Sequence, residues 1–153
     1  MKSLIPQRAA MTEPPRFEDG RLALLVFRIA GATLALNAEE VEAVHDYGTP
    51  SPIPRAPAHL VGLVRLGEHA VPVVDLRAFL GLAEVDGSED HEEDALFRRV
   101  VVVRVDDMHV GLECDRALGV LEVDGAELQE PTVMRSGRLG EFLAAEIHSV
   151  DGV

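Results

Sequence analysis

The sequence predicts a mainly β protein, and three observations lead to this prediction. Apolar residues occur in many short runs of strand length, bounded by residues typical of turns. Residues 24–44 align without a gap on residues 100–120, an offset of 76 positions, with apolar residues on apolar residues. The two-residue turns Ala30-Gly31 and Asp106-Asp107 coincide in this alignment. Duplicated small β units of this kind typically form paired barrels or sandwiches that present surfaces to partners.

The first elements follow from apolar runs and turn residues. Residues 1–20 contain three prolines and no apolar period, so they are predicted to be a disordered tail. Residues 22–29 and 32–36 are predicted to form a hairpin about Ala30-Gly31. Asn37 to Glu40 form either a capping box that opens one helical turn or an irregular link into the next strand, residues 41–44.

A proline-rich segment separates this hairpin from the next. Residues 49–57 contain four prolines, which predicts an extended loop with few ladder hydrogen bonds. Residues 60–66 and 70–74 are predicted strands on either side of the turn Gly67-Glu68. A short helix over residues 76–80 follows, with Asp75 as its N-cap and Gly81 as its stop.

The second half resembles the first but is shorter. Residues 83–94 contain seven acids and no lysine or arginine, which favours a solvated linker over a docking tail. Strands are predicted over residues 100–105 and 108–112, with a further strand segment at 118–123 and a loop at 125–139. From residue 146 onwards, the sequence is not expected to supply a counterpart of the first half's closing strand and helix. A barrel built from this half is therefore expected to have an open edge.

Charge and composition limit the kind of partner and the compartment. A net charge of -13 disfavours nucleic acid and anionic membrane surfaces, because both need a basic protein surface. No run of apolar residues is long enough for a transmembrane helix, and the first residues lack the apolar core of a secretory signal. The single cysteine excludes an intramolecular disulfide and suits a reducing compartment, so we expect a cytoplasmic protein.

No pattern predicts catalysis, a metal site or a cofactor. The six histidines show none of the spacings typical of metal sites, and the acids around His91 indicate a solvated face. Phosphate-binding loops and nucleophile elbows are absent from the sequence. Cys114 aligns with Ala38 in the repeat, which favours a small buried residue over a reactive thiol. The sequence therefore predicts a protein that is not an enzyme.

The run from Pro52 to Leu82 resembles the middle of the CheW-like domain, the chemotaxis coupling family. That family's pattern is a P-x-x-P segment, a strand that begins at a glycine, an Asn-Leu-Arg-Gly turn and a V-P-V-V-D-L strand. The first hairpin and the run His109 to Val123 resemble other segments of the family, so the resemblance covers about residues 22–153. The positions that match the pattern are Pro54, Pro57, Gly62, Val71, Pro72, Val73, Val74, Asp75 and Leu76.

The resemblance implies two pseudo-symmetric, five-stranded SH3-like barrels with short helices. It places the first barrel at about residues 21–82 and the second, incomplete one at about residues 95–153, joined by the acidic linker. It also implies an adaptor that binds the cytoplasmic domain of a methyl-accepting chemoreceptor and the regulatory domain of a CheA-type histidine kinase. A second CheW-like protein is a further partner of this kind.

Some positions depart from the family pattern. The arginine and glycine of the family's turn fall on Gly67 and Glu68, while Arg65 occupies the asparagine position. Strand alternation sends Arg65 to the same face as position 67. The glutamate usual after the first hairpin falls on Ala43. These departures, with the short C-terminus, favour an accessory that binds receptor with weakened kinase coupling over a conventional coupler of both.

The expected docking surface combines an apolar part and a polar margin. Its members are Val41, Ala43, Val44, Gly62 and Leu63, with Arg65, Gly67 and Glu68 at the margin. Core burial of Val41 and Val44, a solvated Arg65 and an ordinary hairpin turn at 67–68 are the alternative readings. A small-molecule site between the two halves, near His45 and Tyr47, is a further hypothesis.

Overall fold

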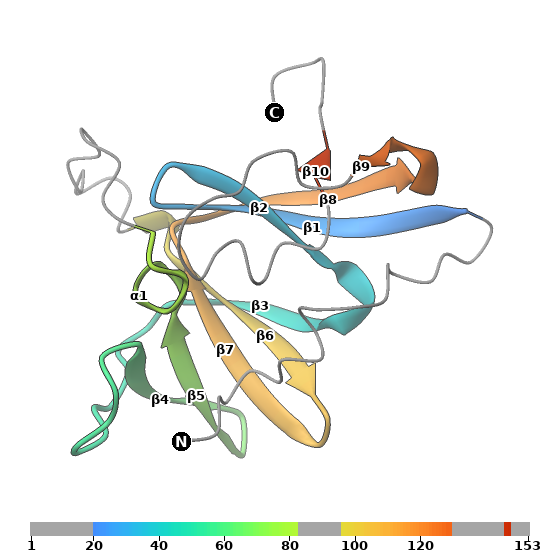
Figure 1. Ribbon diagram of the computed structural model, residues 1–153. Coiled ribbons are helices and arrows are strands. Elements are labelled where there is room, and N and C mark those ends of the chain that lie inside the picture. Colours follow the sequence, from blue (N-terminus) through green and yellow to red (C-terminus); the bar gives the residue numbers. More distant parts are fainter. Residues whose placement is uncertain (1–19, 83–95, 130–145, 148–153) are drawn as a thin grey trace.

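The structure is a computed structural model that describes residues 20–82, 96–129 and 146–147. Within these residues it confirms the mainly β prediction, with the short helix α1 (Leu76–Leu80) and 3₁₀ turns at Ala38–Glu40 and Gly125–Glu127 (Figure 1). The predicted disordered tail, the acidic linker and the C-terminal end lie largely outside the described residues. The strands are β1 (Arg21–Ile29), β2 (Ala32–Asn37), β3 (Val41–Asp46), β4 (Leu60–Leu66), β5 (His69–Asp75), β6 (Arg99–Val105), β7 (Met108–Cys114), β8 (Arg116–Asp124), β9 (Leu128–Gln129) and β10 (Glu146–Ile147).

Turn and cap residues form the local structures that their chemistry predicts. Ala30 and Gly31 both have positive φ, as a two-residue hairpin turn with the twist of its strands requires. The Asn37 side chain accepts a hydrogen bond from the Glu39 amide, so residues 38–40 form a helical turn and not an irregular link. Asp75 accepts hydrogen bonds from the first turn of α1, which confirms it as the N-cap.

The strand pairing confirms the repeat. The offset of 76 carries β1 onto β6, β2 onto β7 and β3 onto β8. In the five-stranded sheet the order is β3-β6-β7-β5-β4, and in the three-stranded sheet it is β2-β1-β8. Each sheet therefore combines a hairpin from one half of the chain with the strand after the hairpin of the other half (Figure 1).

This pairing corrects the expected division of the chain at residues 83–94, because both sheets take strands from the two sides of that segment. The burial of β1 and β6 explains why the two halves of the chain exchange hairpins. The consecutive residues 24–27 of β1 and 100–103 of β6 are all buried, so each strand needs packing on both faces and a neighbour at both edges. Hairpin exchange supplies these neighbours, since β1 lies between β2 and β8, and β6 lies between β3 and β7.

The main core joins the two sheets. It combines residues of β1, β5, β6 and β7 with the buried face of α1, so the halves share one core. A second cluster lies on the other face of the five-stranded sheet and includes Ala43 of β3 together with Val64 and Leu66 of β4. Because β3 and β4 are the two edges of this sheet, the shared cluster shows that the sheet curls around it. The described strands β3 and β4 are not paired, so this SH3-like barrel is open along one seam.

Asp115 connects three elements at the corner between β7 and β8. Its carboxylate accepts hydrogen bonds from Nη2 of Arg77 in α1, 2.9 Å from each oxygen. One of these oxygens also accepts from the amide of Ala30 in the β1–β2 turn, at 2.9 Å. The Asp115 amide donates to the Arg28 carbonyl, also at 2.9 Å. One side chain thus links α1 and both sheets.

Candidate docking surface

The predicted docking residues lie on the two edges of the curled five-stranded sheet. Residues 41, 43 and 44 belong to β3, residues 62, 63 and 65 to β4, and residues 67 and 68 form the turn from β4 to β5. The edges are separated by three strands within the sheet, although both pack on the cluster enclosed by its curl. The structure therefore places the candidates in two groups at the open seam.

In β3, a bulge between Val41 and Ala43 directs these two residues into different clusters. Val41 packs against the main core and Ala43 against the second cluster, so both contribute to folding. Val44 is 41% exposed. Burial in the core thus describes Val41, whereas Val44 leaves an apolar side chain at the surface.

In β4, Gly62 has a structural role and Leu63 is exposed. A Cβ atom on Gly62 would lie 2.3 Å from the Ser51 carbonyl oxygen, so only glycine fits beside that backbone. Ser51 and Leu63 exchange two backbone hydrogen bonds of 2.8 Å, which hold the proline-rich segment against the strand. Gly62 therefore positions the loop, and Leu63, 37% exposed, presents the side chain.

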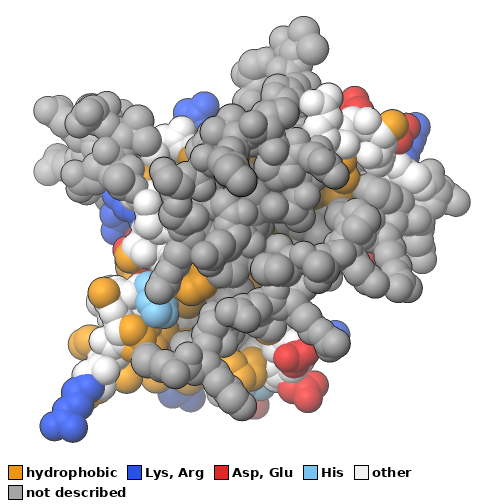
Figure 2. All heavy atoms as spheres, viewed as in Figure 1, with side chains coloured by type: hydrophobic (Ala, Val, Ile, Leu, Met, Phe, Trp, Pro, Cys, Tyr) orange, Lys and Arg blue, Asp and Glu red, His pale blue; other side chains and the backbone are white. Residues whose placement is uncertain are grey.

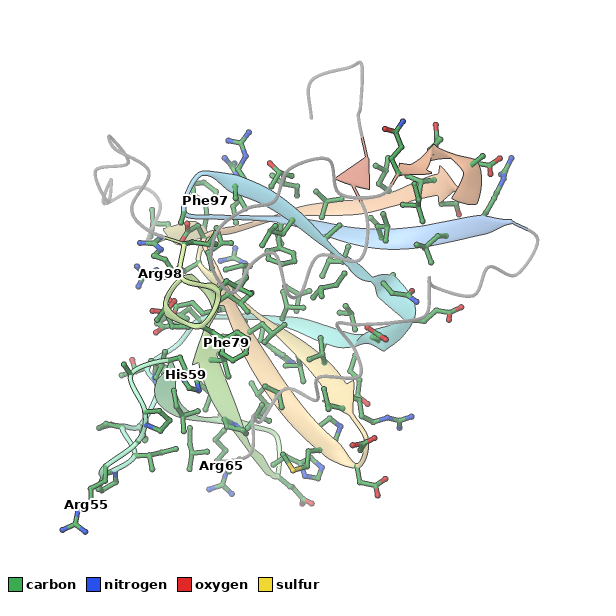
Figure 3. The ribbon with its side chains drawn as sticks, in the orientation of Figure 1. Arg55, His59, Arg65, Phe79, Phe97 and Arg98 are labelled. Carbon is green, nitrogen blue, oxygen red and sulfur yellow. The ribbon has the colours of Figure 1, made fainter. Side chains whose placement is uncertain are left out.

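The β4–β5 turn places its positive φ at Gly67, where φ is 61°, and Glu68 lies outside the left-handed region. Pairing between Leu66 and His69 closes the hairpin, so a glutamate at position 68 is compatible with it. The Arg65 side chain is exposed, and its Nε atom donates to the Gly67 carbonyl at 3.4 Å (Figure 3). The expected polar margin is thus a rigid turn with one base and one acid at its surface.

An exposed acid that the sequence analysis did not consider is Glu42. The bulge in β3 places this exposed carboxylate next to Ala43, the position where the family glutamate was expected. Its Oε2 atom lies 2.6 Å from Nε2 of His109, and its Oε1 atom lies 4.0 Å from Nε of Arg104. The glutamate directly before Ala43 was the only sign in the sequence that the acid could lie one residue earlier. Recognising this required the β-bulge, which a single sequence does not reveal. The acid is therefore present one residue earlier and contacts residues of its own sheet.

A second polar cluster lies around Glu113 of β7. Arg98 (Figure 3) has its Nε atom 3.5 Å from the Glu113 carboxylate, and its guanidinium carbon lies 5.4 Å from the centroid of the Tyr47 ring. Burial, and then the Glu113 charge, raises the pKa of Tyr47 to about 12, so its hydroxyl stays neutral. Burial raises the pKa of Glu113 as well, despite the attraction of Arg98.

Glu113 is expected to make stability depend on pH. The pKa of Glu113 is higher in the folded chain than in the unfolded chain, where it is about 4.5. Its contribution to stability is therefore complete below about pH 4.5 and is lost as the pH rises through the higher pKa of the folded state. Glu113→Gln should therefore gain stability relative to the wild type as pH increases, measured as the difference in Tm between pH 4 and 8. The exposed Glu122→Gln is the control, and a flat difference for both variants would contradict the assignment.

Cys114, the metal-ligating side chains and one surface depression were the other candidates for catalysis or ligand binding. Cys114 is fully buried, and burial followed by the charge of Asp115 raises its pKa to about 11, in line with a small core residue. Within residues 20–82, 96–129 and 146–147, no three metal-ligating side chains converge. A shallow, open depression of about 350 Å³ lies between the starts of β5 and β7, lined by Glu68, His69, Ala70, Pro72, Met108 and His109.

Sequence analysis also missed the exposed apolar residues of β8. Val120 is the repeat equivalent of Val44 and is 65% exposed, and Leu121 beside it is 44% exposed. Among the described strands, β8 pairs with β1 alone, so its second edge has no strand neighbour there. The edge strands β3 and β8, which are equivalent in the repeat, therefore each present an exposed valine at the equivalent position. No helix in the described part of the chain has the length and apolar character needed to cross a membrane.

Comparison with known proteins agrees with this architecture. The crystal structure of the scaffolding protein TtCheW from Thermoanaerobacter tengcongensis is similar with a TM-score of 0.72 at 19% identity, covering 92% of this chain and 86% of that one. The chemotaxis protein CheW of Rhizobium meliloti is 26% identical over 134 residues, 88% of this chain and 81% of that protein. The chemotaxis protein CheW of Thermotoga maritima is 30% identical over 105 residues, 69% of this chain and 64% of that protein.

The family match extends over most of the chain. The model of the CheW-like domain matches residues 23–153, which include both sheets and the turn residues discussed above. The fold, the order of motifs and the relatives thus agree with the resemblance seen in the sequence. The chain belongs to the CheW-like domain family.

Proposed function

We propose that this protein is a cytoplasmic, non-enzymatic adaptor that docks on a chemoreceptor signalling domain and has weakened coupling to a CheA-type kinase. Membership of the family makes the chain a coupling or scaffold protein of chemotaxis, and proteins of this family are scaffolds and not enzymes. The observation that carries the finer proposal is a two-sheet scaffold, seen in the described residues, whose β3 and β4 edges depart from the family pattern.

Exposed aliphatic side chains support receptor docking. Val44, Leu63 and Val120 project from edge strands, where a partner can reach them without disturbing the main core. A chemoreceptor tip is a helical hairpin, and helices bind through apolar side chains at intervals of three to four residues. We therefore propose β3 and β4, with Val44 and Leu63 as apolar contacts and Arg65, Gly67 and Glu68 at the margin, as the docking surface.

The polar departures support weakened kinase coupling. Position 67 has no side chain where the family has an arginine, and position 68 adds a negative charge. Ala43 is packed in the second cluster, while the neighbouring Glu42 is engaged with His109. The base of the family pattern is thus absent from position 67. The acid next to position 43, Glu42, is already paired with His109 and is not free for a partner.

Paired calorimetric titrations test the proposal against its alternatives. The full-length protein is titrated with the receptor signalling domain and with the kinase regulatory domain of its own pathway. Binding to receptor with weak or absent kinase binding supports the proposal. Comparable binding to both makes the protein a conventional coupler. Binding to neither overturns the adaptor function, and a metabolite panel in a thermal-shift assay then tests the small-molecule alternative.

The double substitution Gly67→Arg with Glu68→Gly is expected to increase kinase affinity by about tenfold, because it restores the base and removes the acid. The second change supplies a glycine that can take over the positive φ of the turn. Gly67→Arg alone is the control. It keeps the positive φ on a non-glycine residue, which costs about 1–2 kcal/mol of stability. An unchanged kinase affinity in the double variant would count against this account of the turn.

A further inference from the structure

The edges of the two main sheets differ in what protects them from other chains. An unprotected edge strand pairs readily with a strand of another molecule. On β4, Ser51 covers part of the edge through its two backbone hydrogen bonds with Leu63. On β3, Glu42 and Asp46 add charge, and β2 is short with small exposed residues. The remaining edge of the two sheets is that of β8.

The middle of β8 is apolar and exposed. Leu118, Val120 and Leu121 are 38%, 65% and 44% exposed, and no charged residue interrupts positions 117–121. Val120 is also more exposed than its repeat equivalent Val44, at 41%. A strand edge of this composition favours pairing with the edge strand of another molecule.

The backbone of β8 directs hydrogen-bonding groups toward this edge. The Gly125 amide donates to the Gly20 carbonyl at 2.8 Å, in the register of the β1–β8 ladder. Hydrogen-bonded and non-hydrogen-bonded pairs alternate along an antiparallel ladder, so Val120 and Glu122 point their N–H and C=O groups away from β1. In the described part of the chain, no strand pairs with this side of β8.

The charges of β8 are complementary to the same strand in the opposite direction. Arg116 begins the strand, whereas Glu122 and Asp124 lie at its end, and all three are exposed. Figure 2 shows acidic side chains at the end of this sheet near β9. The guanidinium carbon of Arg116 lies 4.4 Å from the centroid of the Phe97 ring, and no acid in the described ranges forms an ion pair with it. Its N–H donors are therefore open to a carboxylate.

We propose that two copies of this chain pair through β8 in antiparallel orientation, with a twofold axis at Val120. Val120 then faces Val120 of the second copy, and each Arg116 lies at the acidic end of the other strand. The two three-stranded sheets become one sheet in the order β2-β1-β8-β8-β1-β2. The contact is small and the net charge of -13 opposes it, so the dimer is weak.

This inference goes beyond the proposed function and does not rest on it. Pairing through β8 uses no residue of β3 or β4, so each copy keeps the proposed docking surface. A dimer would offer two such surfaces, and a receptor array with several sites would then bind it more tightly than the monomer.

Sedimentation velocity of the full-length protein over a wide concentration range tests the dimer. Val120→Lys and Val120→Glu should each weaken self-association more than about tenfold, because like charges then face each other at the axis. An equimolar mixture of the two variants should associate again, since lysine then faces glutamate. A contact between different surfaces of the two copies would not be restored by mixing.

Val44→Lys is the matched control, because it charges the equivalent exposed valine of the other edge strand and should leave self-association unchanged. Arg116→Glu should weaken it about fivefold, through loss of the two symmetric charge contacts. A wild type that stays monomeric at every concentration would overturn the inference, as would a mixture of the Val120 variants that fails to associate. Neither result bears on the receptor and kinase titrations, so the proposed function is tested separately.

Discussion

Replacement of Asp115 by alanine is expected to lower the free energy of unfolding by about 2–3 kcal/mol. The carboxylate accepts two hydrogen bonds from Arg77 and one from the amide of Ala30, a residue that is only 3% exposed. Without it, the Ala30 amide loses its acceptor in a place that water reaches poorly, and α1 loses a charged contact with the β7–β8 corner. For a domain of this size the loss corresponds to a decrease in Tm of about 4–12 °C.

Thermal and urea unfolding of two further variants separate the effect of losing the negative charge from the effect of losing the hydrogen-bond acceptor. Asp115→Asn keeps an acceptor for the Ala30 amide but removes the negative charge, so it should lose about half as much stability. Glu122→Ala removes the same charge from the surface of β8 and should change stability by less than about 0.5 kcal/mol. Equal stability of Asp115→Ala and wild type would show that the three-element contact does not stabilise the fold.

Gly62→Ala is expected to destabilise the protein by about 2–4 kcal/mol, a large effect for one added methyl group. That methyl group would lie 2.3 Å from the Ser51 carbonyl oxygen and 2.8 Å from its carbonyl carbon. Both atoms belong to the backbone, so no side-chain rotation can relieve the contact. The loop must move, and the two hydrogen bonds between Ser51 and Leu63 are then broken or lengthened.

Hydrogen exchange and thermal unfolding test this prediction together. Faster exchange of the Ser51 and Leu63 amides in Gly62→Ala should accompany a lower Tm. Ser51→Ala is the control, because it removes an exposed side chain and leaves the carbonyl in place, so both measurements should stay near wild type. If Gly62→Ala retained wild-type protection of these amides, close approach of the loop would not be the reason for glycine at this position.

Local elements were largely predictable because their signals lie within a few residues. The Ala30-Gly31 turn, the Asp75 cap and the strands on either side of Gly67-Glu68 occur where the sequence predicted them. The repeat was visible for the same reason, since equivalent strands bury equivalent residues. The strand at residues 118–123 was predicted too short, because β8 begins at Arg116 and its exposed middle lacks the alternation of a half-buried strand.

The candidate site was only partly predictable, because exposure depends on packing between distant strands. Val41 and Val44 look alike in the sequence, yet Val41 packs against the main core and Val44 is exposed at the edge of the sheet. Gly62 was expected to contribute to a surface, whereas its role depends on a backbone segment that begins eleven residues earlier, at Ser51. The involvement of Glu42 also depends on the bulge and on His109, which belongs to the other half of the chain.

The sequence by itself determined the class of fold, the repeat, the turns and caps, the acidic character and the family resemblance. Periodicity, glycine and proline geometry and side-chain capping act over short distances along the chain, which is why these features can be read directly. Only the tertiary structure decided that the halves exchange hairpins, that β3 and β4 pack on one cluster, and that Ser51 is hydrogen-bonded to Leu63. These features arise from burying consecutive apolar residues on both faces of β1 and β6, and that requirement is satisfied only when strands far apart in the sequence pack together.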